Sequence, residues 1–166
     1  MNPYRLSGVR PGDRLCLKRG FVVRDHRGRP TGKRHRRGEL WTVLPDFCQE
    51  HDTIWLAEPD GSQHTWDNTL LQTFSVIARA PTKGTAVRLR RLPQWVRRLP
   101  KESRKAFQYC LRHLVRVDRV DNHGLIELFL GRAADRILGG RMNSINIEAE
   151  YLMTARRSSK RPNKAL

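Results

Sequence analysis

The sequence contains no long hydrophobic run. None of its 166 residues lies in a stretch that approaches the roughly 18–20 consecutive apolar residues of a membrane-spanning helix. The opening segment, MNPYRLSGVRPGDR, lacks the apolar core of a secretory signal. We therefore expect a cytoplasmic protein with no membrane partner.

Cysteine is scarce, and patterns of metal ligands are missing. The three cysteines, Cys16, Cys48 and Cys110, are far apart and odd in number, which predicts neither a disulfide framework nor a Cys-x-x-Cys metal site. We expect the three thiols to pack as small hydrophobic groups. His26 and His35 lie among cations that would disfavour a divalent metal, and His113 and His123 have no cysteine or carboxylate at ligand spacing. The sequence thus predicts no metal and no cofactor.

Motifs that carry catalysis are also missing. The chain has no G-x-G-x-x-G or P-loop phosphate cradle and no G-x-S-x-G nucleophile elbow, and no small-molecule substrate is evident. Asp118 and Asp121, with Glu148 and Glu150, are the carboxylates that a metal-dependent nuclease would use. Their places at a turn and at a strand end are more simply those of turn formers and solvated acids. We expect a protein that is not an enzyme, and keep a small nuclease as the third hypothesis.

Acidic residues are few beside basic ones. The chain has 33 Lys and Arg against 16 Asp and Glu, which gives a formal net charge of +17. Charge of this size repels itself in a compact fold, and a polyanionic partner would neutralise it and release counterions. We expect DNA or RNA as that partner. An acidic protein, an anionic membrane surface and a merely solubilising surface are the alternatives.

The basic residues cluster in a loop, in a connector and in the tail after residue 154. Arginine dominates the loop and the connector, and its planar guanidinium suits bidentate phosphate contacts. The alternative is that these segments are only solvated surface. We take the cations of the loop and the connector as candidate phosphate-binding residues. They are Arg24, Arg27, Arg29, Lys33, Arg34, Arg36 and Arg37 in the loop, and Arg88, Arg90, Arg91, Arg97, Arg98, Lys101, Arg104 and Lys105 in the connector.

Residues 9–77 alternate short apolar segments with turns. We expect strands around residues 15–23, 39–45, 53–58, 62–66 and 73–77, with one helical turn at 67–71. Residues 24–37 hold two glycines, a proline and no apolar residue, which predicts a loop and not a regular element.

This order of elements resembles the small five-stranded β-barrel of the Src-homology, Tudor and KOW families over residues 9–77. The resemblance implies that the long first loop helps to form a binding face for a peptide or a nucleic acid. Here that loop is the arginine-rich one. The aromatic cage with which some Tudor domains bind methylated side chains is not evident, so that activity is not implied.

One helix is expected in the second half. In KESRKAFQYCLRHL (101–114) the apolar residues recur at helical spacing and form one stripe. We expect this stripe, from Ala106 to Leu114, to pack the helix on the barrel and to join the two halves of the chain. Residues 78–92 are interpreted as a basic linker. The stretch WVRRLPKESRKAFQYCLRHLVRV resembles small uncharacterised bacterial proteins, which implies no activity.

The remaining sequence again predicts strands, at residues 113–120, 125–131 and 143–148. HTWDNTLL (64–71) and NIEAEYL (146–152) both pass from a strand through an acidic residue to a short turn closed by leucine. This pattern indicates a weak internal repeat and a second, truncated barrel.

Four tryptophans are present. Trp41 lies in the middle of a predicted strand and is expected in the core. Trp55 and Trp66 suit packing and stacking on unpaired bases equally. Trp95 can anchor the helix or contact a ligand.

Together these patterns predict a mainly β (α+β) protein with one or two helices. It would comprise a five-stranded small barrel (1–77), a basic linker and helix (78–112), a smaller β-rich module (113–153) and a disordered basic tail (154–166). The expected function is largely sequence-tolerant nucleic-acid binding, because a helix-turn-helix reader would need two adjacent helices. A protein-interaction subunit of a larger nucleoprotein or mobile-element assembly is the second hypothesis.

Overall fold

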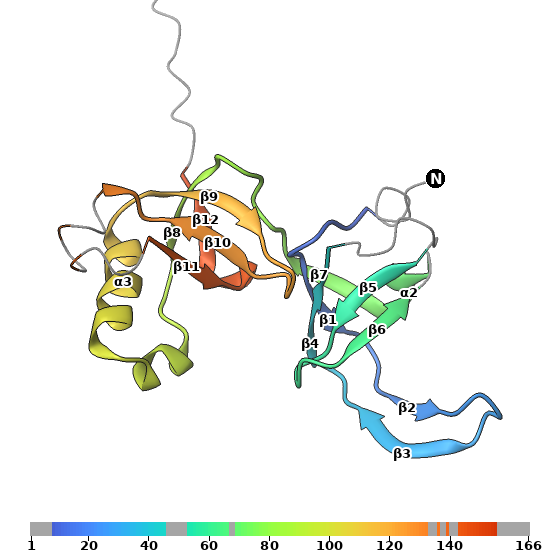
Figure 1. Cartoon of the computed structure of the whole chain (residues 1–166). Helices are drawn as coiled ribbons and strands as arrows, with labels where there is room; N and C mark the ends of the chain where they lie inside the picture. The colour runs from blue at the N-terminus through green and yellow to red at the C-terminus, as the bar shows by residue number, and fades with distance from the viewer. Residues whose placement is uncertain are drawn as a thin grey trace, which may run out of the picture.

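The computed structural model describes residues 8–45, 53–66, 69–132, 136, 139 and 143–155. Over these residues the chain is mainly β, with two α-helices and two five-stranded antiparallel sheets (Figure 1). The expected mainly β class is therefore confirmed. None of the described helices is long and apolar enough to cross a membrane. Cys48 and residues 156–166 of the predicted tail lie outside the described residues, and Thr154, the predicted start of the tail, is instead the last residue of a strand.

The first sheet has the strand order β6-β5-β4-β1-β7. Its strands are β1 (Arg14–Leu17), β4 (Leu40–Val43), β5 (Ile54–Ala57), β6 (Gln63–Trp66) and β7 (Phe74–Ala78), and the short helix α2 (Leu70–Thr73) precedes β7. These strands lie where the apolar segments of residues 9–77 predict them. Between β1 and β4 the chain leaves the sheet and forms a two-stranded hairpin of β2 (Phe21–Arg24) and β3 (Pro30–His35).

The second sheet has the order β11-β10-β9-β8-β12. Its strands are β8 (Ala86–Leu89), β9 (Val115–Val120), β10 (Ile126–Phe129), β11 (Ser144–Ile147) and β12 (Leu152–Thr154). A 3₁₀-helix, η1 (Gln94–Arg98), and the helix α3 (Lys101–Arg112) lie between β8 and β9, and a second 3₁₀-helix, η2 (Ala149–Tyr151), precedes β12. β8 falls within the residues that we interpreted as a linker. Its two buried residues, Val87 and Leu89, alternate with arginines, and two apolar positions are too few to reveal a strand.

The two sheets have the same strand order. Along the chain, β1, β4, β5, β6 and β7 occupy the places that β8, β9, β10, β11 and β12 occupy in the second sheet. A short helical turn precedes the last strand in each, α2 in one and η2 in the other. Residues 64–71 and 146–152 fall at corresponding places, so the internal repeat predicted from them is confirmed in the strand order. In both sheets the longest insertion follows the first strand.

Neither sheet closes into a barrel, so the predicted barrel is corrected to an open sheet. In the described part of the chain, the edge strands β6 and β7 each pair on one side only. Their side chains nevertheless meet, because the ring centroids of Trp66 and Phe74 lie 5.1 Å apart and both rings contact Trp41. β6 and β7 are short and offer few backbone groups for pairing with each other. Edge-to-face aromatic packing fills the space between them instead.

Trp41 lies at the centre of the first core, as its position in the strand predicts. It is 1 % exposed, and burying a large apolar side chain contributes about 1.5–3 kcal/mol to stability. Trp66 is half-buried against the same core. The other buried members are Val9, Leu15, Leu17, Val43, Ile54, Leu56, Leu70 and Phe74.

The helix α3 packs its apolar stripe into the core of the second sheet. Ala106, Phe107 and Cys110 are buried there. Burial raises the pKa of the Cys110 thiol to about 12, which suits its packing as a small hydrophobic group. The expectation that the stripe joins the two halves is wrong, since periodicity identifies the buried face but not its partner. Leu114, at the end of the stripe, is 56 % exposed.

Glycines bring the two sheets into contact. A Cβ on Gly124, between β9 and β10, would lie 2.5 Å from Thr42 Cγ2 and 2.8 Å from the Val43 carbonyl oxygen of β4. A Cβ on Gly12, just before β1, would lie 2.8 Å from Ile126 Cδ1 of β10. At Gly124 the two backbones therefore approach more closely than a residue with a side chain would permit, and at Gly12 the Ile126 side chain packs directly on the glycine.

Gly124→Ala should weaken this contact. Gly124 has a φ of +74°, so alanine would carry the strain of the left-handed region, about 1–2 kcal/mol, and its Cβ would also clash with β4. Gly61→Ala is the matched control, because its φ of +87° brings the same strain but nothing lies within 4 Å of its Cβ. In urea denaturation we expect Gly124→Ala to lower the free energy of unfolding by about 1–3 kcal/mol more than Gly61→Ala. Equal losses would contradict the contact.

Candidate nucleic-acid interface

The β2–β3 hairpin carries the first group of candidate cations. Its strands pair in antiparallel register, with Val22 opposite Arg34. Asp25 closes the turn, because its Oδ1 accepts hydrogen bonds from the N–H groups of Arg27 and Arg29 at 2.8 and 2.9 Å. The hairpin extends away from the first sheet, toward the lower side of the molecule in Figure 1.

The expectation of an irregular loop over residues 24–37 is wrong, because six of these residues, Pro30–His35, form the strand β3. The residues Thr31–Arg34 contain no apolar side chain, so no alternating pattern reveals the strand. β3 is held in place by its hydrogen-bonded pairing with β2. Its last residue, His35, also anchors it, because this side chain is 4 % exposed and contacts the rings of Phe21 and Trp41. A regular hairpin presents its cations in a fixed arrangement, which lowers the entropy cost of binding.

A buried polar cluster anchors the base of the hairpin. His35 Nδ1 lies 2.8 Å from Glu39 Oε2, and Lys33 Nζ lies 2.7 Å from Glu58 Oε2. The Glu58 side chain is 1 % exposed and also contacts His35 and His64. Its hydrogen bond with Lys33 raises the pKa of that lysine. Lys33 is therefore committed to the protein's own carboxylates, and it is the candidate least available to a phosphate.

The insertion of the second sheet carries the second group. Because α3 turns Ala106, Phe107 and Cys110 inward, the basic residues of the helix face outward. Arg91 lies over the Tyr151 ring, 5.4 Å from its centroid. All candidates of this group are exposed. They are Arg88 on β8, Arg90 and Arg91 directly after it, Arg97 and Arg98 on η1, and Lys101, Arg104 and Lys105 on α3.

Most of the candidate cations have no carboxylate partner. Within the described residues, only Arg29 and Lys33 among them form ion pairs, and the pair of Arg29 Nε with Asp25 Oδ2 is long and exposed at 3.5 Å. Arg24 donates to the Gly28 carbonyl oxygen at 2.7 Å. An exposed ion pair such as that of Arg29 with Asp25 contributes about 0–1 kcal/mol to stability. A phosphate could therefore replace the carboxylate at little loss.

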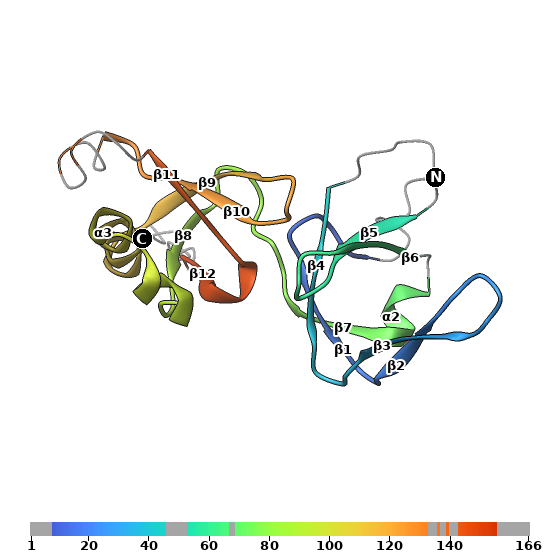
Figure 2. The same cartoon turned by 60° about the horizontal axis from the view of Figure 1, so that its bottom comes forward.

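The structure brings the candidates together as two clusters and not as one track. In Figure 1 the hairpin and α3 both extend to the lower side of the molecule but lie at its opposite ends. They remain apart when that side is turned forward in Figure 2. A single ligand that touches both clusters must therefore be extended.

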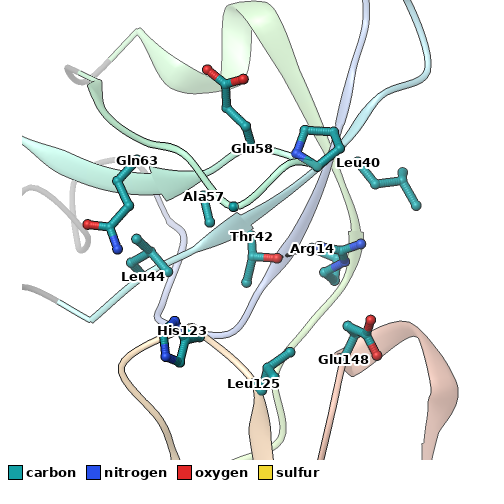
Figure 3. A pocket seen from close by; sticks show the side chains of 12 residues that line it. Arg14, Leu40, Thr42, Leu44, Ala57, Glu58, Gln63, His123, Leu125 and Glu148 are labelled. Atoms are coloured by element: carbon teal, nitrogen blue, oxygen red, sulfur yellow. Dashed lines mark hydrogen bonds between the residues drawn. The ribbon is translucent and has the colours of Figure 1, made fainter. Parts of the chain in front are cut away.

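A cavity of about 300 Å³ lies where the two sheets meet (Figure 3). Arg14 and Thr42 line it from the first sheet, and His123 and Glu148 line it from the second. Arg14 Nε donates to Glu150 Oε2 at 2.8 Å, and the guanidinium also reaches the Thr42 hydroxyl. This link between the sheets escapes sequence reasoning, because its partners are far apart in the chain and belong to no motif.

Three of the four acidic residues considered for a nuclease, Asp118, Asp121 and Glu150, have structural partners, and Glu148 and Glu150 are half-buried and not the solvated acids that were expected. Asp121 accepts hydrogen bonds from the N–H groups of His123 and Leu125, both at 2.9 Å, and so shapes the β9–β10 turn. Asp118 Oδ1 lies 3.6 Å from Lys83 Nζ. No group of three or more His, Cys, Asp or Glu residues in the described part of the chain is placed to hold a metal ion. The geometry therefore favours the turn-forming and ion-pairing roles.

Comparisons with protein-family models, with curated proteins and with solved structures give no match to this chain. A function has to be argued from the arrangement of its own side chains, since a fold by itself does not determine one.

Glu148→Gln should stabilise the protein at neutral pH. Burial raises the pKa of Glu148, the nearby Glu150 adds to the rise, and Glu148 Oε2 has no hydrogen-bond partner among the described residues. A carboxyl whose pKa rises on folding stabilises the fold at low pH and loses that contribution as the pH rises through the folded-state pKa. In thermal denaturation the variant should melt above the wild type near pH 7, and the difference should vanish toward about pH 4.

Glu150→Gln is the matched control for this experiment. It removes a carboxylate whose Oε2 lies 2.8 Å from Arg14 Nε, so it should lower the melting temperature near neutral pH. A Glu148→Gln variant that melted as low as Glu150→Gln would show that the Glu148 carboxylate is a needed partner and not a desolvated charge.

Proposed function

We propose that the protein binds nucleic acid, DNA or RNA, through the phosphate backbone and without catalysing a reaction. The observation that carries the proposal is the state of the candidate cations. All but Lys33 are exposed, and in the described residues only Arg29 and Lys33 among them have a carboxylate partner. They are concentrated on two insertions that occupy the same place in two sheets of equal strand order. Cations left free in this way are available to phosphate oxygens.

Counterion release would supply most of the affinity. Each phosphate that a Lys or Arg neutralises releases condensed counterions, so the affinity falls as salt rises, with a log–log slope of about −0.9 per contact on duplex DNA. With about six to eight contacts the slope would be roughly −5 to −7. The net charge of +17 would also speed the approach of the polyanion.

The binding would be largely independent of sequence. Phosphate contacts fix the position of a protein on a nucleic acid but carry no direct information about its bases. A helix-turn-helix reader places the second of two adjacent helices in the major groove, and α3 is the one long helix in the described part of this chain. Any preference would then arise from the shape of the nucleic acid or from a partner protein.

We also infer that the two open sheets are related to the small barrels of the Src-homology, Tudor and KOW families. The strand order and the long insertion after the first strand support this relationship. In those families the first loop commonly helps to form the binding face. In this chain both insertions at that place are basic, which agrees with the proposed phosphate contacts.

A second hypothesis is favoured by one feature of the second sheet. Leu114 and Phe129 are 56 % and 54 % exposed. Phe129 lies directly opposite Arg116 in the sheet, so these two side chains share a face. Leu114 precedes Arg116 by two residues and therefore lies on the same face as Phe129. Such a face suits a protein partner, and the chain would then be a subunit of a larger nucleoprotein or mobile-element assembly. Partners that remain in a pull-down after nuclease treatment would favour this hypothesis, and loss of every partner would favour direct binding.

The triple variant Arg34→Ala, Arg36→Ala, Arg37→Ala tests the proposed phosphate contacts. These side chains are exposed and have no ion pair among the described residues, so their loss should leave the fold intact. Binding to duplex DNA or RNA should weaken, and the log–log salt slope should become shallower by about one unit per lost contact. Fluorescence anisotropy across a salt series measures both quantities.

The matched control removes the same charge from exposed cations that lie outside both insertions. In the variant Lys83→Ala, Arg116→Ala, Arg119→Ala, the first and last residues pair with Asp118 and Glu127, and Arg116 donates to a backbone carbonyl oxygen. The control should keep the wild-type slope. Equal slopes for all three proteins, or an affinity that does not depend on salt, would refute the proposal.

A further inference from the structure

A groove between η1 and α3 lies within the second basic cluster. It encloses about 300 Å³, at the lower end of the roughly 300–1,000 Å³ that is typical of small-molecule sites. Leu92, Pro93 and Val96 form its apolar lining, and the last two are buried. Its polar lining consists of Gln94 and Arg97 from η1, and Arg104 and Gln108 from α3.

The two helical segments place these polar side chains as matching pairs. Arg104 and Gln108 are four residues apart on α3 and therefore lie on one face of the helix. Gln94 and Arg97 are three residues apart on η1, the spacing at which side chains of a 3₁₀-helix eclipse. Each side of the groove thus contributes one guanidinium and one amide. In the described part of the chain, none of the four side chains has a hydrogen-bond or ion-pair partner.

We propose that this groove binds the base of one unpaired nucleotide, an inference that rests on the proposed nucleic-acid binding. A flat base fits against the apolar lining, and arginine guanidinium planes stack on unpaired bases. Glutamine amides both donate and accept, so Gln94 and Gln108 can pair with the polar edge of the base. Exposed cations beside the groove, Arg98 and Lys101 among them, are placed for the flanking phosphates.

The nucleotide has to be unpaired for a physical reason. In a duplex each base is stacked on both faces and paired along its edge, so it can enter a groove only after it is flipped out at a cost in stacking and pairing. In a single strand these surfaces are free. The groove therefore predicts a preference for single-stranded DNA or RNA, in addition to the charge-driven affinity for any polyphosphate.

The test compares three probes at one salt concentration. They are a single-stranded oligonucleotide, a strand of equal length whose sugars carry no bases, and a duplex of equal length. Gln94→Ala with Gln108→Ala removes both amides and no charge. Gln63→Ala with Gln72→Ala is the matched control, because these glutamines are also exposed but belong to the first module. Anisotropy of a labelled strand gives the dissociation constants.

The wild type should bind the strand with bases about tenfold more tightly than the strand without bases, the change expected when one base is stacked and paired. The groove variant should lose the share of this difference that pairing with the amides supplies, while its affinity for the strand without bases and its salt slope stay unchanged. The control variant should behave as the wild type.

Two outcomes separate the inference from the function on which it rests. If all probes bind with a steep salt slope but the strands with and without bases bind equally, or if the groove variant weakens all probes alike, the nucleotide groove is refuted and phosphate binding stands. If no probe binds in a salt-dependent way, nucleic-acid binding itself is refuted. The groove would then have another occupant, such as a peptide.

Discussion

Guanidinium and ammonium groups cannot be buried without partners, and the described residues obey this constraint. Both cores are built from apolar side chains. Arg14, Lys33 and Arg79 approach the sheets closely, and each is held by a carboxylate. The remaining excess charge has to lie outside the sheets. In the described part of the chain, more than half of the basic residues lie on the hairpin of the first sheet and on the helical insertion of the second.

The repeated strand order explains why two unlike segments carry the same chemistry. In each sheet the first strand lies between the second and the last strand, so a segment inserted after it leaves the sheet at an equivalent place. The sheet fixes that place, and the inserted segment is free to be a hairpin in one module and a helix in the other. Basic composition is what the two insertions share. The strand order of the sheets therefore determines where the candidate interface lies, and each insertion determines its detailed shape.

Much of this fold could be predicted from sequence wherever apolar residues mark an element. The strands β4 to β7 and the stripe of α3 are found in this way, because their buried residues recur with the period of the element. β3 and β8 are missed because arginines and other polar residues occupy their exposed positions and leave too few apolar ones. The exposure of the candidate arginines follows from their composition. The capture of Lys33 by Glu58 does not, since it depends on how two distant hairpins pack.

The contact made through Gly12 and Gly124 has a consequence for how long a ligand would stay bound. Because the sheets touch there, the span between the two insertions is set by the protein and would not adjust to a bound polymer. A polymer held at one insertion would present its next phosphates to the other at a high effective concentration, provided that it can bridge the span. Short fragments would bind at only one insertion and dissociate quickly. Longer fragments would have to dissociate from both insertions at the same time. Two weak contacts would then give a long-lived complex.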